Sequence, residues 1–372
     1  MAQPRHRTRT VGVEEELLLV SSRTGEPLAL SSAVLASAAG EEAGDVFEKE
    51  LHQEQLEFAT RPVADLGALR DEIVRWRGEA GRHAEGVGGQ VAALATSPLP
   101  VRPSRNLGRR YRWLAERFAL TADEQLTGGC HVHVSVESDD EGVAVLDRIR
   151  TWLPLLTAIS ANSPYWQGED TGYASYRSRV WYRLPSAGPY EPFGDAAGYH
   201  ARVRDMLDTG VLRDQGMIYF DARLSHNFPT VEVRVADVCL EPDTTVLVAA
   251  LIRGLVETEA RAWRAGVVVP RVPLDLLRLA AWQAARSGTE GPLLDPRTLR
   301  PVPPAAALDA LLAHTEAALR DTGDLDRARA TLKDLLTRGG GARRQRALRE
   351  EGMELGEVVR ACARITTDAG RS

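Results

Sequence analysis

Lysine is almost absent from this sequence of 372 residues, in which only Lys49 and Lys333 occur and arginine supplies nearly all of the positive charge. No G-x-x-x-x-G-K-[S/T] phosphate-binding loop is present, and a Schiff-base lysine has only two candidates. If the protein handles nucleotide phosphates, arginines and metal ions must neutralise them. The formal net charge of −6 and the lack of a basic patch argue against nucleic acid as a partner.

Cysteine and long apolar runs are also scarce. Cys130, Cys239 and Cys362 lack metal-type spacing, which indicates reduced packing residues. No stretch approaches about 18 consecutive apolar residues, and no apolar segment follows the basic N-terminus as a signal peptide would require. We therefore expect a cytoplasmic protein without a membrane partner. Residues 1–10 should be a flexible segment, and residues 11–372 a single domain with a helical C-terminal region.

The hydrophobic pattern predicts strands first and helices later. Alternating apolar residues predict strands over 10–20, 56–60, 130–137, 217–225 and 230–238. Helical spacing predicts helices over 63–86 and 142–160, and helical patterns dominate from Thr244, with 338–346 as a loop before the last helix. The loop over 162–195 is long enough to be functional. This order favours an α+β fold with a mainly antiparallel sheet.

Ionisable side chains gather on one face of the predicted strands, because residues two apart in a strand point the same way. The sets that share a face are Glu14 and Glu16; His131, His133 and Ser135; Asp221, Arg223 and Ser225; and Thr230, Glu232 and Arg234. Glu57 adds a carboxylate between apolar neighbours. Each set alone has a plainer interpretation as a solvated edge, buried imidazoles or cross-strand ion pairs. Together they predict that one face of the sheet is charged and can bind metal ions.

The residue types leave several site chemistries open. Carboxylates with imidazole and arginine suit Mg²⁺ bridging ATP phosphates, and histidine also admits Mn²⁺. The same residues suit a zinc-dependent hydrolase built on the His-x-His pair. A third hypothesis is a protein that binds ATP or an amino acid without catalysing a reaction. Gly128 and Gly129, just before the histidines, would let a ligand approach the backbone closely.

The sequence resembles the carboxylate–amine ligases of the second glutamate–cysteine ligase family, in the glutamine synthetase superfamily. The matching stretches, in order and spacing from about Val11, are GVEEE, LEFAT, GCHVHV, SPYWQGEDTGYASYRS and PTVEVRVAD. The resemblance implies a funnel of mainly antiparallel sheet flanked by helices. It also implies ATP-dependent amide formation through an acyl phosphate, like that of a glutamate–cysteine ligase but with cysteine used weakly or replaced by another amine.

The resemblance further implies roles for single residues. Mg²⁺ or Mn²⁺ would be held by Glu14, Glu16, Glu57, His131 and Glu232. ATP would contact His133, Ser135, Arg179 and Arg234, and the catalytic arginines would be Arg177, Arg223 and Arg234. Asp170, Thr171 and Ser175 would line the same pocket. Which histidine binds metal stays open, and so do the substrates beyond an amino-acid carboxylate and an amine. A homodimer is the expected assembly.

Overall fold

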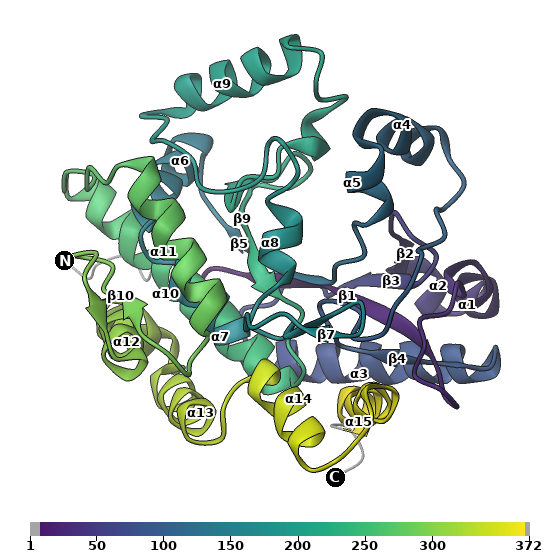
Figure 1. Cartoon of the computed structure of the whole chain (residues 1–372). Coiled ribbons are helices and arrows are strands. Elements are labelled where there is room, and N and C mark those ends of the chain that lie inside the picture. The colour runs from purple at the N-terminus through teal and green to yellow at the C-terminus, as the bar shows by residue number, and fades with distance from the viewer. Residues whose placement is uncertain (1–7, 369–372) are drawn as a thin grey trace.

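Seven strands form one antiparallel sheet in the computed structural model, which describes residues 8–368 (Figure 1). The order across the sheet is β2 (Phe47–Lys49), β3 (Gln55–Ala59), β1 (Val11–Ser21), β5 (Gly129–Ser135), β9 (Thr230–Asp237) and β8 (Ala222–Leu224). The seventh strand, β4 (Gly89–Ala92), pairs with the end of β1. The predicted α+β class with an antiparallel sheet is confirmed.

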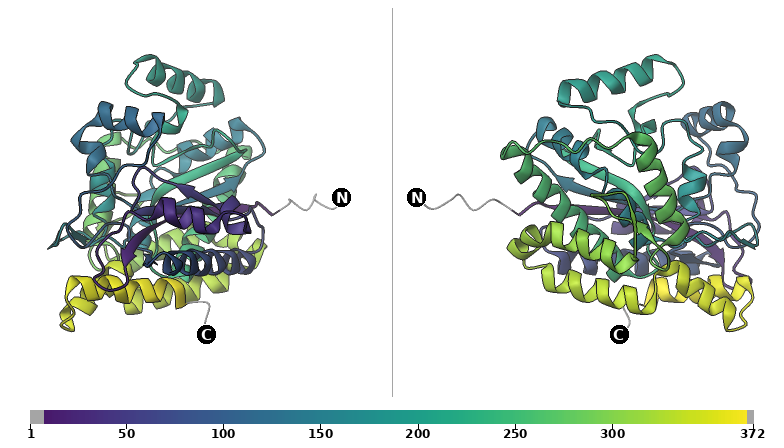
Figure 2. Two further views of the ribbon diagram at one scale, coloured as in Figure 1. Left: turned by 90° about the vertical axis from the view of Figure 1, so that its right-hand side faces the viewer. Right: turned by 60° about the vertical axis from the view of Figure 1, so that its left-hand side comes forward.

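Helices make up most of the remaining chain. They are α1 (Ser31–Ala38), α2 (Glu42–Val46), α3 (Leu66–Gly86), α4 (Arg109–Phe118), α5 (Leu120–Asp123), α6 (Asp139–Ile149), α7 (Leu153–Ser160), α8 (Arg177–Trp181), α9 (Ala196–Asp208), α10 (Pro242–Arg264), α11 (Leu274–Ser287), α12 (Pro304–Thr322), α13 (Leu325–Arg338), α14 (Gly341–Glu350) and α15 (Leu355–Asp368). Two small hairpins are β6 (Tyr165–Trp166) with β7 (Glu169–Asp170), and β10 (Leu293–Leu294) with β11 (Pro301–Val302). In Figure 2, α9 lies at the end of the molecule opposite the C-terminal helices.

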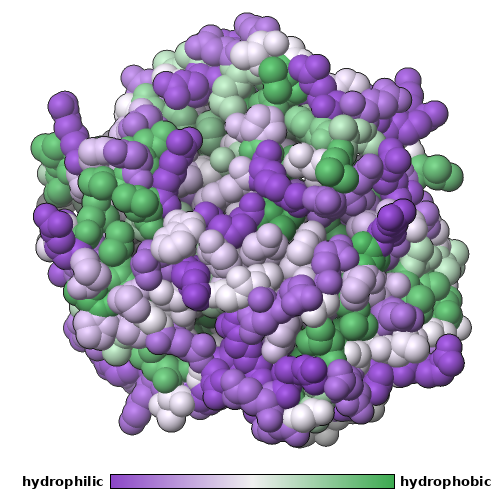
Figure 3. Space-filling model, in the orientation of Figure 1, coloured by the Kyte–Doolittle hydropathy of each residue, from purple (hydrophilic) through white to green (hydrophobic). Residues whose placement is uncertain are grey.

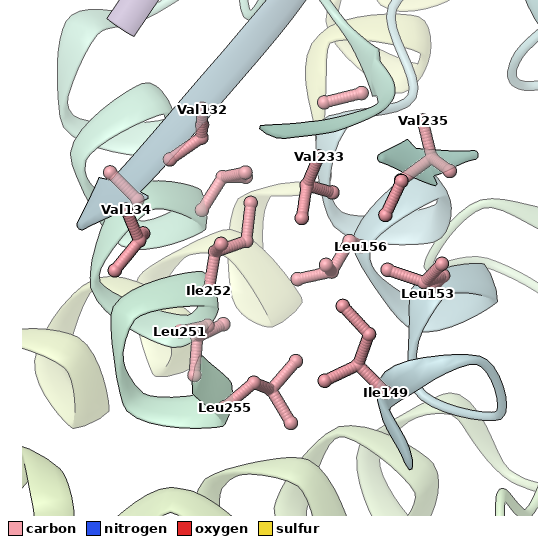
Figure 4. Packing of buried hydrophobic residues seen from close by; sticks show 14 of the residues in the cluster. Val132, Val134, Ile149, Leu153, Leu156, Val233, Val235, Leu251, Ile252 and Leu255 are labelled. Carbon is pink, nitrogen blue, oxygen red and sulfur yellow. The ribbon is translucent and has the colours of Figure 1, made fainter. Parts of the chain in front are cut away.

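The apolar face of the sheet packs on helices α6, α7 and α10. Val132 and Val134 of β5 and Val233 of β9 are almost completely buried against this layer, which includes Leu156 of α7 and Ile252 of α10 (Figure 4). A slip of one residue in either strand would exchange its apolar and polar faces. Burial of the valines therefore fixes the register that keeps the charged side chains on the opposite face.

Glu15 interrupts this apolar face with a charge. The Nε and Nη2 atoms of Arg77 donate to its two oxygens at 2.7 and 2.8 Å, and both side chains are fully buried. Thr245 donates a third hydrogen bond to Glu15 at 2.7 Å, and Arg77 also donates to the carbonyls of Cys239 and Leu240. The helix α3 is thereby tied to β1 directly beneath the polar face.

Replacement of Arg77 by leucine should destabilise the protein by about 3–5 kcal/mol, because it leaves the Glu15 carboxylate buried without its cation. Urea unfolding followed by circular dichroism measures the change. Arg75→Leu is the matched control, since Arg75 lies on the same helix and pairs with Glu42 at the surface. If Arg77→Leu lowered the free energy of unfolding no more than Arg75→Leu does, the buried Arg77–Glu15 pair would not have the importance assigned to it.

Several predicted boundaries differ from the structure. The helix expected over 142–160 is two helices, α6 and α7, and Pro154 lies in the first turn of α7, where its missing N–H is tolerated. The strand expected over 217–225 is paired in the sheet only over Ala222–Leu224. The loop expected over 338–346 is mostly helix α14.

The start of the chain was expected to be flexible over residues 1–10. Residues 1–7 lie outside the described part. Arg9, however, is buried and donates to Glu141 and Glu257 at 2.7 Å each, so the anchored chain begins before Val11.

The surface seen in the orientation of Figure 1 is mostly hydrophilic (Figure 3). Apolar side chains reach the surface over the loop between α10 and α11 and on α11 itself, among them Val267, Val268 and Leu279. No helix within residues 8–368 combines the length and the hydrophobicity of a membrane span.

Candidate active site

The register of the sheet brings the predicted charged residues into adjacent rows. Glu16 lies opposite Glu57, and Glu14 lies opposite His131. His133 lies opposite Glu232, which in turn lies opposite Arg223. Directly opposed residues in an antiparallel pair share a face and lie close together. Five strands thus present their ionisable side chains to one space.

Two groups of side chains in this space have the composition of a metal site. Glu14, His131 and Glu232 form one, and Glu16, Glu57 and His131 form the other, with ligand atoms within 4.8 Å of one another in each. The Nε2 atom of His131 is buried and has no hydrogen-bond partner among residues 8–368, and it lies 3.9 Å from Glu16 Oε1. Carboxylates with one imidazole fit Mg²⁺ or Mn²⁺. All five predicted ligands therefore meet, and metal binding itself stays a prediction.

The two histidines differ in their surroundings. His131 belongs to both groups, and its Nδ1 lies 3.1 Å from Glu14 Oε2. His133 belongs to neither; its Nδ1 lies 3.0 Å from the Thr230 hydroxyl, and its ring meets the edge of Phe228. The Nε2 atom of His133 also lies 3.2 Å from Glu14 Oε1, so both histidines border the carboxylates, and it is membership of both groups that favours His131 as the ligand.

The crowding of carboxylates also perturbs their pKa values. Burial, followed by the nearby Glu50 carboxylate, raises the pKa of Glu16, and the same two causes raise the pKa of Glu57 well above its ordinary value. Burial acts in the same direction on Glu14, but hydrogen bonds from His131 and His133 outweigh it and lower the pKa of Glu14. Like charges at this spacing are stable when a cation lies between them.

Glu50 is a functional candidate that the sequence motifs did not contain. It follows β2 and lines the same cavity as Glu16 and Glu57, with its carboxyl group within hydrogen-bonding reach of Glu57. The available signal was the β2–β3 hairpin, which returns the chain to Glu57 seven residues later. A hairpin prediction over 47–59 would have placed both glutamates in one site.

Arginines enclose the other side of the site. Arg223 donates to Glu232 at 2.7 and 3.1 Å, and Arg234 donates to the same carboxylate. Burial acts to raise the pKa of Glu232, but the two guanidinium groups outweigh it and lower the pKa to about 2. Arg234 also comes within 3.4 Å of His131 Nδ1, because a β-bulge shifts the β5–β9 register between Cys130 and Val132. The Glu232 carboxylate thus positions Arg223 and Arg234 beside the two groups of potential metal ligands.

Arg177 occupies the space that Gly129 leaves. A Cβ atom on Gly129 would lie 2.4 Å from the Nη2 atom of Arg177, and a Cβ on Gly128 would lie 2.8 Å from the Glu16 carbonyl oxygen. The glycine pair was predicted to admit a ligand, and this prediction was wrong. Arg177 itself is 1% exposed, so the glycine serves the close packing of a buried arginine.

The loop before Arg177 is anchored on Asp237, another residue whose role the motifs did not reveal. The buried Asp237 carboxylate accepts hydrogen bonds from Asn162 N–H and from the hydroxyls of Ser163 and Ser175 at 2.7–2.8 Å. Ser163 in turn accepts the backbone N–H of Arg177 at 3.0 Å. Asp237 therefore ties the end of β9 to the start of α8.

Four predicted pocket residues serve the loop or the strand ends instead. Asp170 pairs with Arg346 at 2.6 Å, Thr171 donates to the Pro164 carbonyl, and Ser175 bonds Asp237. Ser135 accepts the backbone N–H of Thr10 at 3.1 Å. These side chains line neither of the two cavities described below.

Two cavities open on the polar face. The first, the acidic cavity, has a volume of about 270 Å³ and combines Glu14, Glu16, Glu50, Glu57, His131 and Arg234 with an aromatic wall of Tyr111, Phe118, Trp181 and Tyr219. The second, the hairpin cavity, has a volume of about 280 Å³ and is lined by Tyr199, His200, Ser225, His226, Asn227 and Phe228. Arg223 lines both cavities, so they meet at the Arg223–Glu232 pair.

Arg179 lies outside both cavities. Its guanidinium group rests on the Tyr182 ring at 4.8 Å, and Tyr182 donates to the buried Asp221 at 2.8 Å. Burial raises the pKa of Asp221 to about 7, although Tyr182 and the two nearby arginines act to lower it. The predicted ATP contact of Arg179 therefore has no support in its position.

The raised pKa of Asp221 predicts a pH-dependent effect of Asp221→Asn. The folded state binds the Asp221 proton more tightly than the unfolded state, so this contribution to stability is present below pH 3.8 and is lost as pH rises through about 7. The variant should match the wild type near pH 4 and exceed its stability at pH 8 by about 4 kcal/mol, because the shift from 3.8 to about 7 is about three pKa units at about 1.4 kcal/mol each. Urea unfolding midpoints measured from pH 4 to pH 8 test this. If the midpoints of the wild type and of Asp221→Asn changed with pH by the same amount, the prediction would be contradicted.

Comparison with solved structures shows which proteins share this fold. The glutamate–cysteine ligase from Francisella tularensis, solved in complex with AMP, superposes with a TM-score of 0.71 at 12% identity, over 98% of this chain and 90% of that one. A bifunctional glutathione synthetase from Pasteurella multocida gives a TM-score of 0.69 at 14% identity, over 97% of this chain and 53% of that one. The fold is that of glutamine synthetase-like ligases.

Sequence relatives give the family. Residues 10–364 match the model of glutamate–cysteine ligase family 2, and the chain belongs to that family. A Streptomyces avermitilis protein provisionally named glutamate–cysteine ligase 2-1 is 61% identical over 96% of this chain and 99% of its own length. A Streptomyces coelicolor relative, provisionally named glutamate–cysteine ligase 2, is 60% identical over 97% of this chain and its full length. By family the chain is an ATP-dependent carboxylate–amine ligase.

Proposed function

We propose that this protein activates the side-chain carboxylate of an amino acid such as glutamate with ATP and joins it to an amine, with cysteine as one candidate acceptor. The observation that carries the proposal is the position of Arg223, which lines both cavities and pairs with Glu232. Glu232 belongs to one of the two groups of potential metal ligands and also pairs with Arg234, which lines the acidic cavity. The arrangement suits an ATP molecule whose triphosphate runs from the hairpin cavity toward the substrate acid in the acidic cavity.

The two cavities suit different parts of the substrates. The hairpin cavity offers Phe228, which is 61% exposed, together with Tyr199 and the polar side chains of Ser225 and Asn227, which suits a nucleoside. The acidic cavity offers the carboxylates and His131, so the phosphates and the reacting acid belong at its floor. Its aromatic wall would cover the amine and exclude water from the activated acid.

The reaction needs two displacements. A carboxylate oxygen of the acid attacks the γ-phosphorus of ATP, ADP leaves, and an acyl phosphate forms; the amine nitrogen then attacks the acyl carbon, phosphate leaves, and the amine gives up a proton. Bound Mg²⁺ or Mn²⁺ would neutralise charge on the phosphate oxygens. Glu14, Glu16, Glu57, His131 and Glu232 would hold these ions. Arg223 and Arg234 would brace the transferred phosphoryl group, a task of positioning and charge neutralisation.

The test is a cross of substrates with the purified protein, Mg²⁺ and ATP. Glutamate and other carboxylates are each combined with a panel of amines that includes cysteine, and phosphate, ADP and condensed product are measured by mass. We expect phosphate release that requires both partners and equals the product formed. Cleavage that proceeds without ATP in the presence of zinc would favour a metal-dependent hydrolase, and nucleotide binding without ADP formation would favour a binding protein. The homodimer stays a separate prediction.

A further inference from the structure

Trp181 lines the acidic cavity beside two arginines, Arg234, which also lines this cavity, and Arg177, which is 1% exposed and is not one of its lining residues. It ends helix α8, one turn after Arg177, and its ring lines the cavity. The Cζ atom of Arg177 is 5.5 Å from the centre of the Trp181 ring, and the Cζ atom of Arg234 is 5.7 Å from it. Tyr219 packs against the same ring in a T-shaped contact with centroids 5.0 Å apart.

Both guanidinium groups are short of hydrogen-bond acceptors. The Nε atoms of Arg177 and Arg234 are buried and have no partner among the described residues. The two guanidinium groups beside this ring repel each other, and the negative face of the aromatic ring attracts both. Tryptophan gives the strongest such attraction of the three aromatic side chains. These two N–H groups therefore lack the acceptors that buried polar groups ordinarily have.

We infer that Trp181 is a positioning residue: its ring holds Arg234 in the acidic cavity, against the repulsion of the buried Arg177, as a clamp for a phosphoryl group. The inference rests on the proposed function for the identity of the anion. Without the ring, the guanidinium groups would separate and Arg177 would turn toward the Asp237 carboxylate, whose negative charge already acts on it. Because a clamp of this kind acts on charge in the transition state, its loss should lower kcat more than it raises the KM for ATP.

Three variants separate this role from simple packing. Trp181→Leu removes the aromatic face and keeps an apolar wall, whereas Trp181→Phe keeps an aromatic face. Trp263→Leu makes the same change at a half-buried tryptophan near the end of α10 that lines neither cavity. Each protein is measured in two ways: ATP-dependent hydroxamate formation from carboxylate and hydroxylamine, and calorimetric binding of inorganic phosphate with Mg²⁺ present. Thermal melting confirms that each variant is folded.

We expect Trp181→Leu to lower kcat for hydroxamate formation by about 30-fold or more and to weaken phosphate binding by about tenfold, with the KM for ATP within about threefold. Trp181→Phe should remain within about fivefold of the wild type in both measurements, and Trp263→Leu should match it. The inference is overturned if Trp181→Leu behaves like the wild type, or if Trp181→Phe is as impaired as Trp181→Leu. If the wild type forms no hydroxamate from any carboxylate, the proposed function fails, and phosphate binding alone then decides the role of Trp181.

Discussion

Arg234→Ala should lower kcat by about a hundred- to a thousand-fold while the protein stays folded. The loss of one preorganised charge contact to a developing anion costs about 2.7–4 kcal/mol of transition-state stabilisation. Arg234 is buried beside Glu232, His131 and Trp181, where water cannot replace its charge. Steady-state kinetics with saturating ATP and the best carboxylate–amine pair measures the change.

Folding should survive this substitution because Glu232 keeps a second cation. Arg223 still donates to both of its oxygens after Arg234 is removed. Arg234→Lys is the informative companion variant, since it keeps the charge but loses the planar fork that bonds Glu232 and that, under the proposed function, would face the phosphates. We expect it to recover only part of the rate. An alanine variant that retains near-normal kcat would remove Arg234 from the mechanism.

Glu57→Gln should change stability and activity in opposite directions. In the presence of a chelator the variant should melt at a higher temperature than the wild type, because the change relieves repulsion from Glu50 and Glu16. With Mn²⁺ or Mg²⁺ the wild type should gain stability by mass action, about 2.7 kcal/mol at 100 times the Kd, and the variant should gain much less. Turnover should fall by about a hundred-fold, comparable to the loss of one charge contact.

The pH dependence of the metal-free protein gives an independent check on Glu57. Its pKa is raised in the folded state, so this contribution to stability is present below the ordinary value of 4.5 and is lost as pH rises through the raised pKa. The wild type should therefore gain stability on mild acidification, and Glu57→Gln should gain less. Glu85→Gln, at an exposed position of α3, is the control. In the metal experiment, Mn²⁺ should raise the melting temperature of the wild type more than that of Glu57→Gln. An equal rise in both proteins would exclude Glu57 as a metal ligand.

The sequence predicted the polar face well because strand parity is a local property. Alternation alone assigned Glu14, Glu16, His131 and Glu232 to one side of their strands, and the valines between them supplied the buried side that fixes the register. Motif order added which strands belong to one site. The first inference needs only short-range pattern, and the second needed the resemblance to a known family.

Other features depend on contacts between distant segments, which alternation does not encode. The β-bulge that brings Arg234 to His131 is set by the pairing of β5 with β9. Glu50 joins the site only through a hairpin that had not been predicted. Gly129 gave the wrong indication because glycine permits any close neighbour, and here that neighbour is Arg177. Asp170 and Thr171 share a motif with Arg177, yet they stabilise the loop that carries it.

The central claim is that ATP phosphorylates the carboxylate before the amine attacks, and transfer of an oxygen atom tests it most directly. The wild-type protein is supplied with Mg²⁺, ATP, an amine and a carboxylic acid labelled with ¹⁸O in the reacting carboxyl group. Formation of an acyl phosphate makes one carboxyl oxygen the bridge to phosphorus, so each phosphate released with the amide should carry one ¹⁸O atom. Amide formation with unlabelled phosphate would contradict the account.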